Sequence, residues 1–383
     1  MAARVCGNPG TIQLPVAVPG LSPGTAGDEV HGIAMPNAII IGAGITGLSA
    51  AQVLQDAGWQ IEIIDKGQKP GGRFASRWFG ERTRRIDVGA QFLSARDPDF
   101  TAAVTAWQAR GWVRRWCTGI PLLTADSLMG GEDGFPRWLG VGGMQGLGRT
   151  LASSFILRQP ATVTWLRPNA GRWTVEAVPG DAVRGTATGP AVMVEADAVI
   201  LTQPVPQVIH LLGSCGLPLP EGLAQVRYDP CVAVVIDVPN VSAPLLGHPG
   251  AVRIEDPASP LSWIASANGR GEVLHGDLLL LHASGGWSAA HQDHTTAQLA
   301  EELLADATPT LKRLGIIRDL SRCHAEARLW RYSRCVTPHA APHLPVAGGP
   351  PLLIAGDGFG NCPRVEGAWL SGRSAGIAIR DAR

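Results

Sequence analysis

The sequence predicts an α/β fold in which helices cover a parallel β-sheet, and three observations near its beginning favour this fold class. Apolar residues at 38–41 form a candidate buried strand, a glycine-rich turn and a helical segment at about 45–57 follow, and a second strand is expected at 61–65. Strand, helix and strand in this order make a βαβ unit, whose two strands run parallel and are covered by the helix. The helix is expected to stop at Gly58, which suits the left-handed C′ position.

The later elements follow from periodicity and from breaks at glycine and proline. With 383 residues and 45% hydrophobic content, the chain can bury one large core or two ordinary ones, so two interleaved domains are expected. Strands are expected at 161–166, 173–177, 191–201, 233–238, 277–282 and 352–355, and helices at 144–154, 206–212, 296–305 and 369–380.

Charge and hydropathy disfavour several function classes. Basic and acidic residues are equal at 32 each, so no global field favours nucleic acid or an anionic membrane. No apolar segment of about 18 residues runs without glycine or proline, which argues against a membrane span. A small-molecule partner is therefore the expectation, with no nucleic acid and no membrane span; the oligomeric state stays open.

The seven cysteines are scattered and never in CxxC spacing, which disfavours a disulfide framework and a zinc site. Reduced thiols of a cytoplasmic protein fit this pattern. His291 and His294 could share a metal on one helical face, but no third ligand stands nearby, so a polar turn is expected and no metal.

Residues 1–34 contain repeated proline and glycine, little charge and no helical or strand period. They lack the basic start and apolar core of a signal peptide. The segment is interpreted as a flexible extension, and Met35, just before the first strand, is a candidate translation start.

The turn at 42–47 has the spacing Gly-x-Gly-x-x-Gly between a strand and a helix. Gly42 permits the tight turn, Gly44 lets backbone approach a pyrophosphate, and Gly47 lets the helix pack close to the strand. The helix start offers unpaired N–H groups to the phosphates, and Asp65 can accept hydrogen bonds from ribose hydroxyls. The segment therefore predicts dinucleotide binding.

Four further stretches indicate which dinucleotide. Residues 70–73 (PGGR), 85–92 (RIDVGAQF), 353–357 (LIAGD) and 364–372 (RVEGAWLSG) resemble motifs of the FAD-binding amine oxidase superfamily. The resemblance implies FAD in a Rossmann-type domain like that of glutathione reductase and p-hydroxybenzoate hydroxylase, with an interleaved α+β substrate domain. The implied FAD domain comprises 37–105, 137–212 and 325–383, and the substrate domain 106–136 and 213–324.

Within the superfamily, the sequence is most similar to the renalase-like group of bacterial flavoproteins, through 140–144, 197–204 and 330–332. Two positions depart from that group: Arg328-Leu329 replaces a usual His-Arg, and Phe92 stands where a hydroxylated aromatic is common. Cys362 follows the Gly-Asp pair, whereas the cysteine that tethers flavin in monoamine oxidases precedes it; non-covalent binding is therefore expected.

The motifs also have physical roles. Arg73 can neutralise pyrophosphate charge, and Asp357 can accept from ribityl hydroxyls or water. A helix beginning near Val365 would aim N–H groups at the flavin N1 and C2 carbonyl, where negative charge develops on reduction; the alternative is an ordinary loop–helix junction. The expected cofactor-binding residues are Gly42, Gly44, Ile45, Thr46, Gly47, Asp65, Lys66, Gly72, Arg73, Gln91, Phe92, Val163, Asp357, Val365 and Ala368.

The middle of the chain is expected to roof the flavin ring. The candidate substrate residues are Trp263, Asn268, His282, Trp287 and Trp330, and simple packing is the competing interpretation for each of them. The leading hypothesis is an FAD-dependent oxidase or dehydrogenase that takes a hydride from a small donor, for example a reduced nicotinamide dinucleotide isomer, with dioxygen as acceptor. The alternatives are an amine oxidase or polyene desaturase-type flavoenzyme, and a non-catalytic binding protein of the same fold.

Overall fold

A six-stranded sheet contains the predicted βαβ unit. The computed structural model describes residues 35–79, 83–181, 185–273, 275–316 and 318–382, so the segment 1–34, interpreted as an extension, lies outside the described residues. The strand order is β20 (Leu344–Pro345), β21 (Leu352–Ile354), β14 (Ala198–Leu201), β1 (Asn37–Ile41), β2 (Gln60–Ile64) and β9 (Ile156–Arg158). All neighbouring pairs are parallel except β20–β21. The expected parallel sheet is confirmed.

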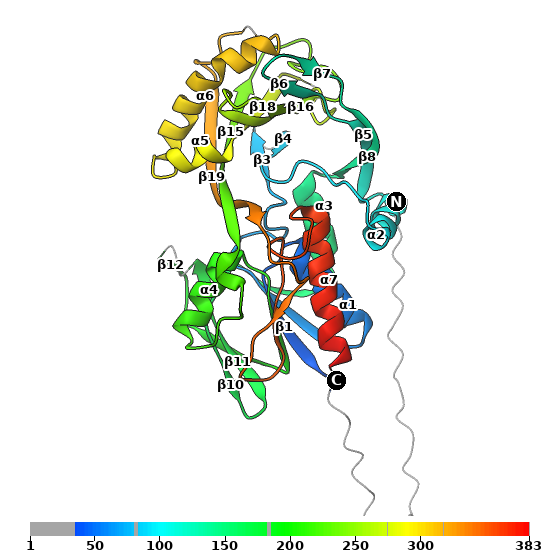
Figure 1. Cartoon of the computed structure of the whole chain (residues 1–383), viewed down its shortest axis with the longest axis vertical. Coiled ribbons are helices and arrows are strands. Elements are labelled where there is room, and N and C mark those ends of the chain that lie inside the picture. Colours follow the sequence, from blue (N-terminus) through cyan, green and yellow to red (C-terminus); the bar gives the residue numbers. More distant parts are fainter. Residues whose placement is uncertain (1–34, 80–82, 182–184, 274, 317, 383) are drawn as a thin grey trace, which may run out of the picture. The chain divides into compact units, whose positions relative to one another are not determined.

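Two helices from opposite ends of the chain lie side by side against this sheet: α1 (Ile45–Asp56) and α7 (Val365–Asp381) (Figure 1). A side chain at Gly372 would place its Cβ 2.0 Å from the carbonyl oxygen of Thr46, so glycine permits this close contact. The first and last helices of the described residues thus lie in one layer.

The predicted strand at 191–201 is two strands in two sheets, which corrects the sequence interpretation. β13 (Val192–Ala196) pairs antiparallel with β11 (Arg172–Asp181), whereas β14 pairs parallel with β1. The chain changes sheet at Asp197, whose carboxylate accepts a hydrogen bond from the Asn37 backbone N–H at 2.9 Å. The sheet that contains β11 and β13 also contains β10 (Ala161–Asn169) and β12 (Thr186–Ala187).

A seven-stranded sheet forms the other main layer. Its order is β19 (His324–Thr337), β15 (Arg227–Val238), β18 (Asp277–Ala283), β17 (Leu261–Ser266), β16 (Ala251–Glu255), β6 (Leu122–Thr124) and β7 (Leu128–Met129). The domain limits given above remain a prediction. Strand pairing crosses the limit between residues 324 and 325, because β19, in the predicted FAD domain, pairs with β15, in the predicted substrate domain.

Alternation along these strands gives the seven-stranded sheet two different faces. Leu279 and Leu281 belong to the core beneath α5 (Gly285–Ala290) and α6 (Thr296–Arg313). Leu278 and Leu280 instead pack with Val88. The second face therefore lies against the segment that follows the hairpin of β3 (Ser76–Phe79) and β4 (Arg84–Asp87).

The remaining elements complete the surroundings of that segment. β5 (Val113–Gly119) and β8 (Glu132–Gly140) form a separate antiparallel pair, and Leu93 makes a bridge to Trp138 of β8. The remaining helices are α2 (Pro98–Ala109), α3 (Met144–Ala152), α4 (Val205–Ser214) and the short 3₁₀ helix η2 (Leu223–Gln225). None of the helices among the described residues is long and apolar enough to cross a membrane.

Candidate functional site

The glycine turn leaves the start of α1 open for a ligand. Gly44 is the N-cap, no side chain caps the helix, and no acidic residue stands in its first turn. A Cβ at Gly47 would lie 2.0 Å from the Gly42 carbonyl oxygen, whereas a Cβ at Gly44 would meet nothing within 4 Å. Gly47 therefore serves packing and Gly44 faces open space. No side chain caps the N–H groups at the start of this helix, which fits binding of a phosphate group there.

Asp65 holds the loops around this turn. Its carboxylate accepts hydrogen bonds from the backbone N–H groups of Ala43 at 2.6 Å and Gly67 at 2.5 Å. Burial raises the pKa of Asp65, while these two hydrogen bonds act in the opposite direction. Lys66 is exposed, and Val163, on the strand that starts beside Asp65, is buried in the adjoining core.

The second glycine pair lies directly on the first turn. Gly71 donates its backbone N–H to the Ala43 carbonyl at 2.8 Å, and a Cβ at Gly72 would lie 3.4 Å from the Gly44 Cα. Arg73, which follows, binds the Asp357 carboxylate through both terminal nitrogens at 2.6 Å. Two expected cofactor residues are therefore joined by a bidentate ion pair.

The tyrosine Tyr228, which sequence reasoning missed, also reaches Asp357. Its hydroxyl donates to the carboxylate at 3.3 Å, and burial followed by the charge of Asp357 raises the pKa of Tyr228. The available signal was slight: the chain has only two tyrosines, and the other one, Tyr332, packs against this ring with 6.0 Å between centroids.

The Asp87–Phe92 segment is fixed from several sides. Asp87 is fully buried and accepts from the Met144 backbone N–H, at the start of α3, at 3.0 Å. Gln91 donates its side-chain amide to the carbonyl oxygens of Asp87 and Gly89 at 2.7 and 3.0 Å. The Phe92 ring packs against Trp116 and Trp263.

Three of the five substrate candidates gather at this segment. His282 Nε2 and Trp330 Nε1 lie 3.3 and 2.9 Å from the carbonyl oxygen of Val88. Trp263 Nε1 donates to the Gln91 side-chain oxygen at 3.3 Å. The three side chains come from β18, β19 and β17, so the sheet face opposite α6 supplies them together.

The structure does not bring the other two candidates to this segment. Trp287 lies on α5, where its ring stacks on His291 with 3.9 Å between centroids and its Nε1 donates to Asp306 at 2.8 Å. Asn268 donates its side-chain amide to the Gly276 carbonyl at 2.9 Å within the β17–β18 turn. Trp287 thus packs between α5 and α6, and Asn268 makes a contact within its own turn.

His282 leads to a prediction about pH. Burial lowers the pKa of His282 to about 4, so the unfolded chain takes up this proton near pH 6.5 while the folded chain does not. Folding stability is therefore lost as the pH falls from about 6.5 towards 4. Urea titration measures the free energy of unfolding at each pH. Between pH 7.5 and pH 4.5, we expect this free energy to fall by at least about 1 kcal/mol less in His282→Gln than in wild type. His275→Gln, at an exposed histidine, is the control. Equal falls in the free energy of unfolding for wild type and His282→Gln would contradict the lowered pKa of His282.

The helix α7 begins at Val365, as the sequence predicts. Arg364 is the N-cap without a side-chain cap, and Ala368 donates to the Arg364 carbonyl at 2.9 Å. The Glu366 carboxylate turns aside and accepts the backbone N–H groups of Arg96 and Asp97 at 2.7 and 2.5 Å. Glu366, a second residue whose role the sequence did not indicate, thereby anchors the helix start to the loop before α2.

Ser371, in the second turn of α7, binds two loops that lie before the helix. Ser371 accepts the Gly356 backbone N–H at 2.9 Å and donates to the Pro342 carbonyl at 2.6 Å. These contacts fix the loop that carries Asp357 relative to α7.

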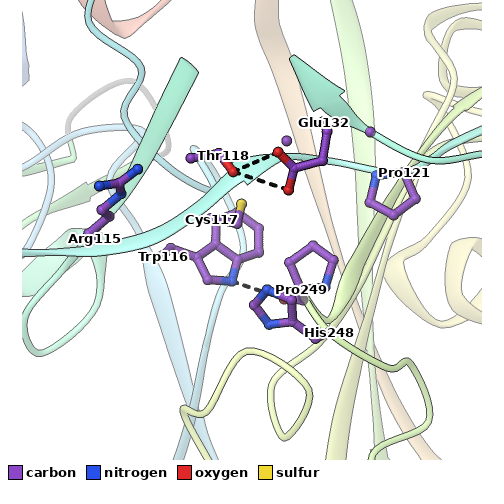
Figure 2. Close-up of a pocket in the computed structure, with 10 residues that line it drawn as sticks. Arg115, Trp116, Cys117, Thr118, Pro121, Glu132, His248 and Pro249 are labelled. Atoms are coloured by element: carbon purple, nitrogen blue, oxygen red, sulfur yellow. Dashed lines mark hydrogen bonds between the residues drawn. The ribbon is translucent and has the colours of Figure 1, made fainter. Parts of the chain in front are cut away.

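A cavity of about 590 Å³ lies between the β5–β8 pair and the residues just before β16 (Figure 2). Thr118 donates to Glu132 at 3.0 Å on one side, and His248 and Pro249 lie on the other. Trp116 lines the cavity and donates its indole N–H to the Pro249 carbonyl at 2.9 Å. Because Trp116 also contacts Phe92, one residue joins the cavity to the segment that the motifs assign to the cofactor.

Among the described residues, no group of three or more His, Cys, Asp or Glu side chains is placed to hold a metal ion. His291 Nδ1 lies 2.7 Å from the Trp287 carbonyl, and His294 Nδ1 lies 2.7 Å from Glu302. The six cysteines in the described part of the chain are free thiols.

The parallel sheet, the open glycine turn and the acidic residue after β2 define an α/β protein with a dinucleotide-binding domain. Residues 40–107 match the model of the NAD(P)-binding Rossmann-like domain, and residues 117–379 match that of the flavin-containing amine oxidoreductases. The chain therefore belongs to the flavin-containing amine oxidoreductase family. It is a flavin-dependent oxidoreductase, and FAD is its cofactor.

Individual relatives are distant. A neurosporene-forming phytoene desaturase from Cereibacter sphaeroides is 36% identical over 77 residues, which are 20% of this chain and 13% of that protein. A putative protoporphyrinogen oxidase from Exiguobacterium is 14% identical with a TM-score of 0.64, over 92% of this chain and all of the other. A redesigned putrescine oxidase is 16% identical with a TM-score of 0.59, over 91% of this chain and all of the other. These two structures show the common fold alone.

Proposed function

We propose that this chain is a renalase-like oxidoreductase that takes a hydride from a small polar donor onto the N5 atom of non-covalently bound FAD and passes the electrons to dioxygen. The observation that carries the proposal is the convergence of Trp263, His282 and Trp330 on the Val88–Gln91 segment. The motif resemblance assigns this segment to the flavin, so these three side chains are the candidates to face a donor.

Bound FAD would supply the redox chemistry by accepting two electrons and a proton from the donor. The chain's own groups bind and orient. The open start of α1 holds phosphate, Asp65 receives ribose hydroxyls, and the Arg73–Asp357 pair sets the ribityl side. The indoles of Trp263 and Trp330 exclude water, and His282, neutral because of its lowered pKa, orients the donor rather than acting as an acid.

If the donor enters through the cavity that Trp116 lines, the polar lining supports a small polar donor over the long apolar substrate of a polyene desaturase. The lining includes the charged residues Arg115 and Glu132 and also His248, and such side chains would leave an apolar chain poorly solvated. A true amine remains the second candidate because the Glu132 carboxylate could receive an ammonium group.

Anaerobic stopped-flow reduction of the reconstituted protein tests the proposal. We expect rapid bleaching of the flavin by an NAD(P)H isomer or a similar small donor, slower bleaching by amines, and reoxidation when oxygen is admitted. Acid precipitation should leave all the flavin in the supernatant. Reduction by an amine alone, or flavin retained in the pellet, would contradict the corresponding part of the proposal.

A further inference from the structure

We propose that Arg270 is a positioning residue that fixes the orientation of Gln91 at the cofactor. The side chain of Arg270, in the β17–β18 turn, is 0% exposed. One terminal nitrogen donates to the Gln91 side-chain oxygen at 2.7 Å and the other to the Gln91 backbone carbonyl at 2.9 Å. This fork spans the main chain and the side chain of one residue. The inference depends on the proposed placement of the Gln91 segment at the flavin.

The hydrogen bonds leave Gln91 only one amide orientation. Its oxygen receives Arg270 and the Trp263 indole N–H, while its nitrogen faces the carbonyls of Asp87 and Gly89. A flipped amide would oppose donors to donors and acceptors to acceptors. Gln91 therefore cannot rotate to meet a ligand without breaking contacts on both sides.

The charge of Arg270 is balanced inside the protein. Glu272 Oε2 lies 3.1 Å from its Nε, and Asp87 Oδ2 lies 4.0 Å from its Nη2; these carboxylate side chains are 2% and 0% exposed. Arg85 approaches Glu272 at 3.9 Å. Two arginines thus lie beside two buried carboxylates, and loss of an arginine would leave a buried carboxylate without its nearest opposite charge.

Arg270 also contacts the aromatic wall of the cavity. Its guanidinium carbon lies 4.8 Å from the centre of the Trp116 ring, which in turn packs against Phe92. A planar guanidinium can stack on this ring while both ends of its fork bind Gln91, whereas a lysine ammonium can satisfy only part of that arrangement. The geometry accounts for arginine at this position.

The test is a double-mutant cycle between Arg270→Lys and Gln91→Met, read as the dissociation constant of FAD from the apoprotein and as the visible spectrum and midpoint potential of bound flavin. We expect each single variant to raise the dissociation constant by about tenfold, since each breaks charge-assisted hydrogen bonds. The double variant should raise it by less than the product of the two. Both single variants should shift the flavin spectrum.

Arg84→Lys is the matched control, because Arg84 binds Asp237 through both terminal nitrogens at 2.5 and 2.6 Å and touches neither Gln91 nor Asp87. It should change neither the FAD affinity nor the spectrum. If the double variant raises the FAD dissociation constant by the full product of the two single effects, the proposal is overturned. If Arg270→Lys fails to fold, unchanged FAD affinity and spectrum in Gln91→Met would overturn it as well. None of these readouts needs a donor, so wild-type protein that binds FAD but is reduced by no donor would refute only the proposed function.

Discussion

Gly44→Val is expected to lower the affinity for FAD by at least about 100-fold while leaving the fold intact. A Cβ at Gly44 meets no protein atom within 4 Å, and the backbone there has φ −78° and ψ 176°, which valine adopts readily. The added methyl groups would instead occupy the open space before α1, where a phosphate must approach the backbone. Titration of the apoprotein with FAD, followed by fluorescence, measures the effect, and circular dichroism reports the fold.

Two other glycines separate this effect from simple destabilisation. Gly213→Val, in α4, also adds a side chain where nothing lies within 4 Å, and it should bind FAD as wild type does. Gly47→Val should fail to fold, because its Cβ would lie 2.0 Å from the Gly42 carbonyl oxygen. Full flavin occupancy in Gly44→Val would mean that the phosphates lie elsewhere.

The elements near the two ends of the chain could be predicted from sequence because their signals are local. The glycines of the first turn, the apolar strands beside it and the start of α7 at Val365 each depend on residues a few positions apart. The same motifs that imply FAD also impose backbone requirements, such as the contact between Gly372 and Thr46, so fold and cofactor could be inferred together.

The centre of the candidate site could not be predicted in this way. Arg270 and Gln91 are 179 residues apart in the chain, and no periodicity relates them. A buried arginine in a turn gives the same sequence signal as a solvated one until the sheet brings its partners together. Residue type likewise did not separate Trp263, on the face towards Val88, from Trp287, which packs beside α6.

The second large effect is expected at the start of α7. Val365→Pro should lower the midpoint potential of bound flavin by about 30 to 60 mV, since a hydrogen bond to a charged group contributes about 1.5–3 kcal/mol and about 30 mV of a two-electron couple corresponds to about 1.4 kcal/mol. Among the described residues, the backbone N–H groups of Val365, Glu366 and Gly367 have no hydrogen-bond acceptor. Their dipoles are therefore available to stabilise negative charge on the flavin when it is reduced.

Proline at position 365 removes one of these donors without breaking the helix. The first helical position tolerates proline, and Arg364 before it has φ −135° and ψ −171°, the extended conformation that a following proline requires. Gly367 is unsuitable for this purpose, because a Cβ there would lie 1.7 Å from the Cys362 carbonyl oxygen and the variant would disturb the loop. Val365→Ala controls for the lost side chain, and Thr296→Pro, at the first position of α6, controls for proline itself. If Val365→Pro binds FAD with an unshifted potential, α7 does not direct its N-terminus at the flavin, and the reduced ring must obtain its stabilisation from another part of the chain.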